Sequence, residues 1–109
     1  MIVDGDELRN NPFNIMDKVQ TFLKLYPHID YRKRLRFEPK KGFYCAITRN
    51  NTSKCLGKSK GRTYLEMDER SKKYLHRHYL HHNVVLSKLL NRLRVPIPLW
   101  LKFELSMNL

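Results

Sequence analysis

The sequence predicts an α/β chain, mostly helices with a few short strands, that forms one domain at most over its 109 residues. Three patterns carry this prediction. Apolar residues recur at helical spacing after residue 12 and again between residues 75 and 93. Between these two regions, Phe43, Cys45 and Ile47 occupy every second position, which is typical of a strand.

The first third of the chain is expected to hold a strand end, a turn and a helix. Residues 1–3 (MIV) are interpreted as the tail of a buried strand, and the next two residues (DG) as a turn before a short helical turn. Asn11 and Pro12 predict a helix start, with Asn11 as the N-cap. This helix should end before Pro27. Its apolar face is interpreted as core packing and comprises Ile15, Met16, Val19, Phe22 and Leu23.

A basic run, residues 31–36 (YRKRLR), comes next. We interpret it as a solvated surface, with a patch that binds glycan or phosphate as the alternative. Leu35 and Phe37 then indicate a short extended segment. Residues 39–42 (PKKG) separate it from the strand that contains Cys45.

The last third is expected to be helical. Asp68 is the predicted N-cap, and Glu69 lies in the first turn, where the helix dipole favours a negative charge. The pattern fits one long helix or two helices in line, with a break near residues 82–83. Pro96 and Pro98 should end it. The apolar stripe comprises Leu75, Tyr79, His82, Leu86, Leu89, Leu90 and Leu93, and a short final helix should dock through Trp100, Leu101 and Leu105.

Composition narrows the class of partner. The net charge is +12, with 41% hydrophobic and 29% charged residues, which suits a folded protein. A charge of this sign favours nucleic acid, an acidic membrane surface or a sulfated glycan, and composition does not choose among them. The sequence contains no apolar run long enough for a membrane span, and no signal peptide is visible in it.

Residues 56–64 (LGKSKGRTY) form a glycine- and lysine-rich loop. Gly57 and Gly61 allow tight turns and close approach of a ligand to the backbone. Successive backbone N–H groups, together with the neighbouring basic side chains, would receive phosphate or sulfate oxygens. The spacing differs from that of a Walker A loop. A solvated basic loop is the alternative interpretation.

The two cysteines, Cys45 and Cys55, allow three interpretations. A zinc site is disfavoured, because the sequence contains no CxxC pair with which the histidines at 76, 78, 81 and 82 could form a zinc-finger pattern. Two reduced core cysteines or a disulfide remain, of which the disulfide is favoured. Two overlapping N-x-[ST] sequences begin at Asn50 and Asn51, and they mildly favour a lumenal or secreted setting as glycosylation candidates.

These residues resemble the heparan sulfate sulfotransferases, and most of all the sulfotransferase domain of the bifunctional heparan sulfate N-deacetylase/N-sulfotransferases. The resemblance covers nearly the whole chain in the same order. It is carried by residues 4–8 (DGDEL), 16–25 (MDKVQTFLKL), 41–45 (KGFYC), 55–64 (CLGKSKGRTY), 82–90 (HNVVLSKLL) and 98–101 (PLWL). Leu65 stands where the family often has Pro, and Lys24 where it often has Gly; both affect local turns more than chemistry.

The resemblance implies a P-loop-like sulfotransferase fold, a parallel sheet with flanking helices, with a disulfide between Cys45 and Cys55. It implies that Tyr44, where N-sulfotransferases usually carry Trp, packs on the adenine of the sulfuryl donor, 3′-phosphoadenosine 5′-phosphosulfate. Lys60 would stabilise charge on the transferring group, and no metal is implied. The segment expected to contact the phosphates of this co-substrate comprises Lys60, Gly61, Arg62, Thr63 and Tyr64.

The family's phosphosulfate loop and catalytic carboxylate have no match in this sequence. We therefore expect residues 1–109 to be the C-terminal fragment of a single sulfotransferase domain, without a catalytic residue of its own and inactive alone. The resemblance implies an N-sulfotransferase that acts on heparan sulfate in the Golgi lumen, held at the membrane only through an N-terminal anchor, with no nucleic acid partner. The alternatives are a segment of a 3-O- or 6-O-sulfotransferase, or a non-catalytic basic module that binds polyanions.

Overall fold

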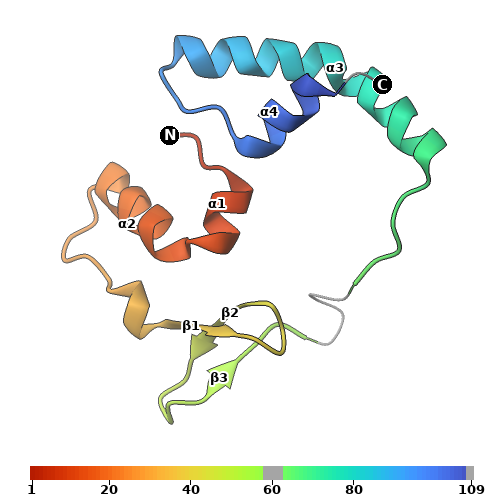
Figure 1. Ribbon diagram of the computed structural model, residues 1–109. Coiled ribbons are helices and arrows are strands. Elements are labelled where there is room, and N and C mark those ends of the chain that lie inside the picture. Colours follow the sequence, from red (N-terminus) through yellow and green to blue (C-terminus); the bar gives the residue numbers. More distant parts are fainter. Residues whose placement is uncertain (58–62, 108–109) are drawn as a thin grey trace. The chain divides into compact units, whose positions relative to one another are not determined.

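The computed structural model describes residues 1–57 and 63–107. The chain divides into two compact units, Met1–Thr63 and Tyr64–Leu109 (Figure 1). The first holds two helices, a 3-10 turn and a small sheet, and the second holds two helices. The expected mixture of helices and short strands is therefore confirmed.

The first unit begins with two capped helices, α1 (Gly5–Asn10) and α2 (Pro12–Leu23). The Asn11 side chain accepts a hydrogen bond from the Asn14 amide at 3.5 Å and Pro12 lies at the start of α2, as the sequence predicts. The helix ends where Lys24 adopts a left-handed conformation (φ 55°), ahead of Pro27.

Two expectations for this region are wrong. Residues 1–3 form no strand and are exposed, because no described strand pairs with them. The apolar face of α2 is only partly core. Ile15 is buried, but Phe22 and Leu23 in the last turn are 59% and 55% exposed. Apolar spacing predicted the helix correctly but did not reveal that nothing described in this unit covers its C-terminal turn.

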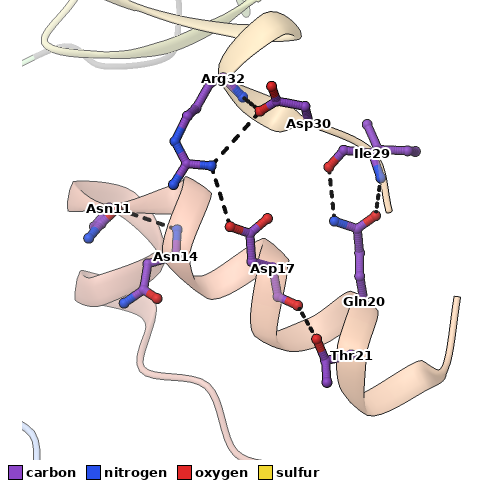
Figure 2. Close-up of polar contacts among 8 residues, drawn as sticks. All are labelled: Asn11, Asn14, Asp17, Gln20, Thr21, Ile29, Asp30 and Arg32. Carbon is purple, nitrogen blue, oxygen red and sulfur yellow. Dashed lines mark hydrogen bonds and ion pairs between the residues drawn. The ribbon is translucent and has the colours of Figure 1, made fainter. Parts of the chain in front are cut away.

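A polar bridge ties α2 to the segment that leads into the sheet (Figure 2). The Gln20 side chain is 3% exposed, and it both accepts from the Ile29 amide (2.7 Å) and donates to the Ile29 carbonyl (3.0 Å). The 3-10 turn η1 (Tyr31–Lys33) follows, capped by the Asp30 carboxylate. These bonds fix where the chain leaves α2 and enters the first strand.

The sheet has three antiparallel strands in the order β1 (Leu35–Glu38), β2 (Phe43–Ile47) and β3 (Ser53–Lys54). The turn between β1 and β2 closes at Gly42, whose φ of 77° favours glycine. Cys45 is buried at the centre of β2. The described strands contain no parallel pair, so the parallel sheet implied by the resemblance remains a prediction.

The second unit is a helical hairpin of α3 (Glu69–Arg92) and α4 (Leu99–Ser106). The Asp68 side chain caps α3 by accepting from the Ser71 amide at 2.9 Å, as predicted. The helix runs without a break through residues 82–83 and settles the choice in favour of one long helix. Leu90 and Leu101 are buried where α4 packs against α3.

Among the described helices, none is both long and apolar enough to cross a membrane.

Candidate functional site

Tyr44 lies on β2 between two other aromatic rings of the first unit. Its ring centroid is 5.2 Å from that of Phe13 on α2 and 5.4 Å from that of Phe37, its partner across the β1–β2 pair. The interplanar angles are 83° and 68°, so both contacts are edge contacts rather than face-to-face stacks. The half-buried Tyr44 side chain is therefore held in place by its neighbours.

Arg32 extends this cluster with a positive charge. Its guanidinium lies 5.5 Å from the centre of the Phe13 ring and pairs with Asp17 at 3.4 Å and Asp30 at 3.9 Å (Figure 2). Both ion pairs are exposed, so each contributes little alone. Arg36, in the same basic run, donates to the Asn51 side chain at 2.7 Å. Arg32 and Arg36 of the basic run therefore form contacts within the first unit.

The disulfide between Cys45 and Cys55 is present, as the resemblance implies. It joins the buried centre of β2 to the residue that follows β3. The sequence neighbour of Cys45 is Tyr44, and the glycine-rich loop starts directly after Cys55. The link therefore anchors one end of that loop to the strand that carries Tyr44. The loop it closes also carries Asn50 and Asn51, both exposed.

The predicted phosphate-contacting segment is described only in part. Lys60, Gly61 and Arg62 lie outside the described residues. Thr63 is exposed and ends the first unit, and Tyr64 is 69% exposed and begins the second. The structure thus brings Tyr44 together with the disulfide, while the grouping of residues 60–64 with Tyr44 remains a prediction.

A family model described as a sulfotransferase domain matches residues 1–90. The chain belongs to the sulfotransferase domain family. This match covers the sheet, the disulfide and most of α3. The resemblance seen in the sequence is confirmed at the level of the family.

Proteins named as bifunctional heparan sulfate N-deacetylase/N-sulfotransferases are similar in sequence to this chain over almost its full length. Identity is 55% to a bifunctional heparan sulfate N-deacetylase/N-sulfotransferase of Drosophila melanogaster, over 96% of this chain and 10% of that protein. It is 50% to enzyme 4 of that name from Mus musculus and 49% to enzyme 3 from Homo sapiens, each over 97% of this chain and 12% of the relative. The chain spans about a tenth of the length of these relatives.

The histidines of this sulfotransferase-domain chain do not form a metal site among the described residues. No group of three or more His, Cys, Asp or Glu side chains there is arranged to hold an ion. Both thiols are used in the disulfide, so the zinc interpretation loses its sulfur ligands. His78 and His82 share a face of α3, with ring centroids 6.4 Å apart.

His76 has a different role, which the sequence analysis missed. It is buried, and its Nδ1 lies 3.0 Å from Oε2 of Glu104 on α4. The pair borders a cleft of about 820 Å³ within the second unit, whose walls include Tyr79, Trp100 and Phe103. His76, Asn83 and Leu90 recur at intervals of seven residues, about two helical turns, and this was the available signal. The predicted stripe included Leu90 but ran through Tyr79 and His82, both of which are exposed.

Proposed function

We propose that this chain supplies part of the donor-binding site of a heparan sulfate glucosamine N-sulfotransferase. Such an enzyme transfers a sulfuryl group from 3′-phosphoadenosine 5′-phosphosulfate to the amino group of glucosamine. The observation that carries the proposal is the 49–55% identity, over 96–97% of this chain, to relatives named as N-sulfotransferases. Residues 1–109 would be the C-terminal portion of the sulfotransferase domain.

Tyr44 is proposed to bind the adenine of the donor. Phe13 and Phe37 contact its ring at interplanar angles of 83° and 68°, so neither ring stacks on it face to face. A planar base gains most from a rigid aromatic platform, since little side-chain freedom is then lost on binding. Tyr presents a smaller face than the Trp usual in the family, which predicts a weaker platform at this position.

The segment after Cys55 is proposed to hold the phosphates. Arg62 would form a planar fork on a phosphate group, and the Gly61 backbone allows close approach. Lys60 would stabilise the negative charge that develops as the sulfur–oxygen bond to the donor breaks and the nitrogen–sulfur bond forms. Thr63 and Tyr64 would complete the contacts with their hydroxyl groups. The disulfide supports this assignment because it fixes where the segment begins.

The acceptor amine must also lose a proton to a base. No residue of this chain matches the family's catalytic carboxylate, so we propose that the chain alone is inactive. A donor-dependent rate of heparan sulfate N-sulfation by the purified chain would contradict this. Placement in the Golgi lumen and action on heparan sulfate are proposed from the relatives' names and family. The disulfide is consistent with an oxidising compartment and the net charge of +12 with a sulfated glycan.

Two alternatives remain. A 3-O- or 6-O-sulfotransferase segment is one, because Tyr44 is the residue type that 3-O enzymes carry there. A basic module that binds polyanions without catalysis is the other, favoured by the charge alone. The N-sulfotransferase proposal and the 3-O- or 6-O-sulfotransferase alternative both predict specific binding of the donor nucleotide. The basic module predicts only salt-sensitive binding of any polyanion.

The test is calorimetric titration of the chain with 3′-phosphoadenosine 5′-phosphate, the nucleotide left after transfer. We expect saturable binding that Arg62→Ala abolishes. Arg77→Ala is the matched control, since Arg77 is an exposed arginine of α3 outside the proposed site. Binding that is lost equally in both variants, or that resembles binding of inorganic polyphosphate, would favour the basic module.

A further inference from the structure

The loop between β2 and β3 carries two overlapping acceptor sequences for N-linked glycans. Their asparagines, Asn50 and Asn51, differ in the hydrogen bonds that their side chains form. The loop is a tight turn in which the Asn51 amide donates to the Thr48 carbonyl (3.0 Å) and the Thr48 amide to the Thr52 carbonyl (2.8 Å). Asn50 lies at the tip of this turn and is exposed. Within residues 1–57 and 63–107, its side chain makes no hydrogen bond.

Asn51, by contrast, is held against the sheet. Nη2 of Arg36, on β1, donates to Oδ1 of Asn51 at 2.7 Å. The same guanidinium donates to the Asn51 carbonyl at 3.3 and 3.4 Å. Asn51 also has a φ of 58°, a conformation that the turn imposes. Its side chain is therefore directed back toward β1 instead of outward.

The hydroxyl groups of the two acceptor sequences also differ in how tightly they are held, again with the Asn51 sequence the more constrained. For Asn50 the hydroxyl is that of Thr52, which is exposed and shares a hydrogen bond of 2.6 Å with the Thr48 hydroxyl. For Asn51 it is that of Ser53, half-buried on β3, which donates to the Glu38 carboxylate of β1. A hydrogen bond to an ionised group is stronger than one between hydroxyls, so the Ser53 hydroxyl is less available.

We propose that Asn50 is the glycosylation site of this chain and that Asn51 is not modified. The proposal rests on the lumenal placement that accompanies the proposed function. The donor is a lipid-linked oligosaccharide pyrophosphate. A bond forms between the Asn50 amide nitrogen and the first sugar carbon, the bond from that carbon to the pyrophosphate oxygen breaks, the lipid pyrophosphate leaves and the amide nitrogen loses a proton.

The fold accommodates this product at Asn50 without loss of a described side-chain hydrogen bond. A glycan on Asn51 would have to grow past the Arg36 guanidinium and disturb three hydrogen bonds. Because the two asparagines are adjacent, a glycan on the first also obstructs the second. We therefore expect one glycan per chain, at the tip of the hairpin.

The test is secretion of the full chain from cultured animal cells behind a cleavable signal sequence. The glycan would be removed enzymatically in heavy-oxygen water, which converts the modified asparagine to a mass-labelled aspartate. We expect the label on Asn50 alone. Thr52→Ala removes only the Asn50 acceptor sequence and should abolish the glycan. Ser53→Ala removes only the Asn51 acceptor sequence and should leave it unchanged.

Several outcomes would overturn the proposal. They are label on Asn51, loss of the glycan in Ser53→Ala, and an unglycosylated chain in which Cys45 and Cys55 are nonetheless joined. The last of these shows that the chain reached an oxidising lumen and was still not modified. None of them bears on donor binding, which is measured by nucleotide titration of the same material. Failure of this inference and failure of the proposed function are therefore distinguishable.

Discussion

Nδ1 of His76 and Oε2 of Glu104 lie 3.0 Å apart and join α3 to α4. A carboxylate can only accept a hydrogen bond, so the imidazole donates from Nδ1. His76 is 7% exposed, whereas the Glu104 side chain reaches partly into solvent. With the buried Leu101, this bond fixes the short helix α4 on the long one.

Removal of the acceptor should loosen α4. Glu104→Ala leaves the buried Nδ1–H group without a described partner, which costs about 1–3 kcal/mol of unfolding free energy. Glu104→Gln retains an acceptor oxygen and should lose less. Trp100, the one tryptophan of the chain, lies on α4, so its fluorescence during urea unfolding reports the change. Equal stability of the Ala variant and the unsubstituted chain would show that the bond does not hold α4.

The bridge between Gln20 and Ile29 makes a second prediction, for the first unit. Gln20→Leu keeps a similar volume but leaves the amide and carbonyl of Ile29 without this partner. We expect a loss of about 1–3 kcal/mol, because these groups are partly buried. Urea unfolding gives the stability, and hydrogen exchange of the Ile29 amide gives the local effect.

Thr21→Val is the matched control for this bridge. The Thr21 hydroxyl donates to the Asp17 carbonyl on the exposed side of the same helix (Figure 2). Its loss should change stability by less than about 0.5 kcal/mol. If the two variants were equally destabilised, the effect would belong to α2 in general and not to the contact with Ile29.

Features of this fold were predictable where the interacting residues lie close together in the sequence, and were not where the partners lie in separate segments. The caps at Asn11 and Asp68 were predictable because each satisfies a backbone amide three residues ahead, within one turn. The strand that contains Cys45 was predictable from alternation within a single segment. The buried polar residues Gln20 and His76 were not predicted, since their partners lie in other segments and no periodicity reveals them.

The candidate site shows the same division. The residues alone indicated an anion-binding loop and favoured a disulfide over two reduced cysteines, but only the family resemblance assigned Tyr44 to the donor. The contact of Phe37 with Tyr44 depends on hairpin register, and that of Phe13 depends on how α2 packs on the sheet. The sequence offers no local signal for the second contact. The expected strand at residues 1–3 was wrong for a related reason, because strand formation needs a partner.

Asp68 gives a prediction about pH. Hydrogen bonds from the Ser71 hydroxyl and amide hold the pKa of Asp68 below its ordinary value. A lowered pKa in the folded state means that the ionised cap contributes stability above the ordinary pKa of about 3.9. That contribution is lost as the pH falls through the folded value. The Asn side chain of Asp68→Asn can still cap the helix but does not titrate. The stability of this variant relative to the unsubstituted chain should therefore rise as the pH falls below the ordinary pKa of Asp.

The measurement for Asp68 is thermal unfolding followed by circular dichroism across the acidic range. Ser71→Ala is the companion variant, since it removes the hydroxyl that contributes most to the shift. It should raise the Asp68 pKa toward the ordinary value in a carbon-detected NMR titration. An unchanged pKa in Ser71→Ala would mean that the hydroxyl does not bind the carboxylate.

The disulfide should stabilise the first unit. Chain-entropy arguments give about 2.7 kcal/mol for a loop that spans ten residues, as between Cys45 and Cys55. Joint replacement by Cys45→Ala and Cys55→Ala should lower the unfolding free energy by about this amount. Urea unfolding of the unsubstituted chain with and without a reducing agent provides the comparison. A chain that is equally stable when reduced would show that β2 and the loop are held by the sheet alone.

Tyr44 makes the last prediction, which depends on the proposed donor site. Tyr44→Ala should weaken binding of 3′-phosphoadenosine 5′-phosphate by about 1–3 kcal/mol, the usual contribution of an aromatic ring stacked on a base. Tyr44→Trp enlarges the platform and should strengthen binding. Tyr74→Ala on α3 is the control, because Tyr74 is an exposed tyrosine of the second unit. If Tyr44→Trp bound no better and Tyr44→Ala no worse, the Tyr44 ring would serve only its contacts with Phe13 and Phe37, and adenine would have to bind elsewhere.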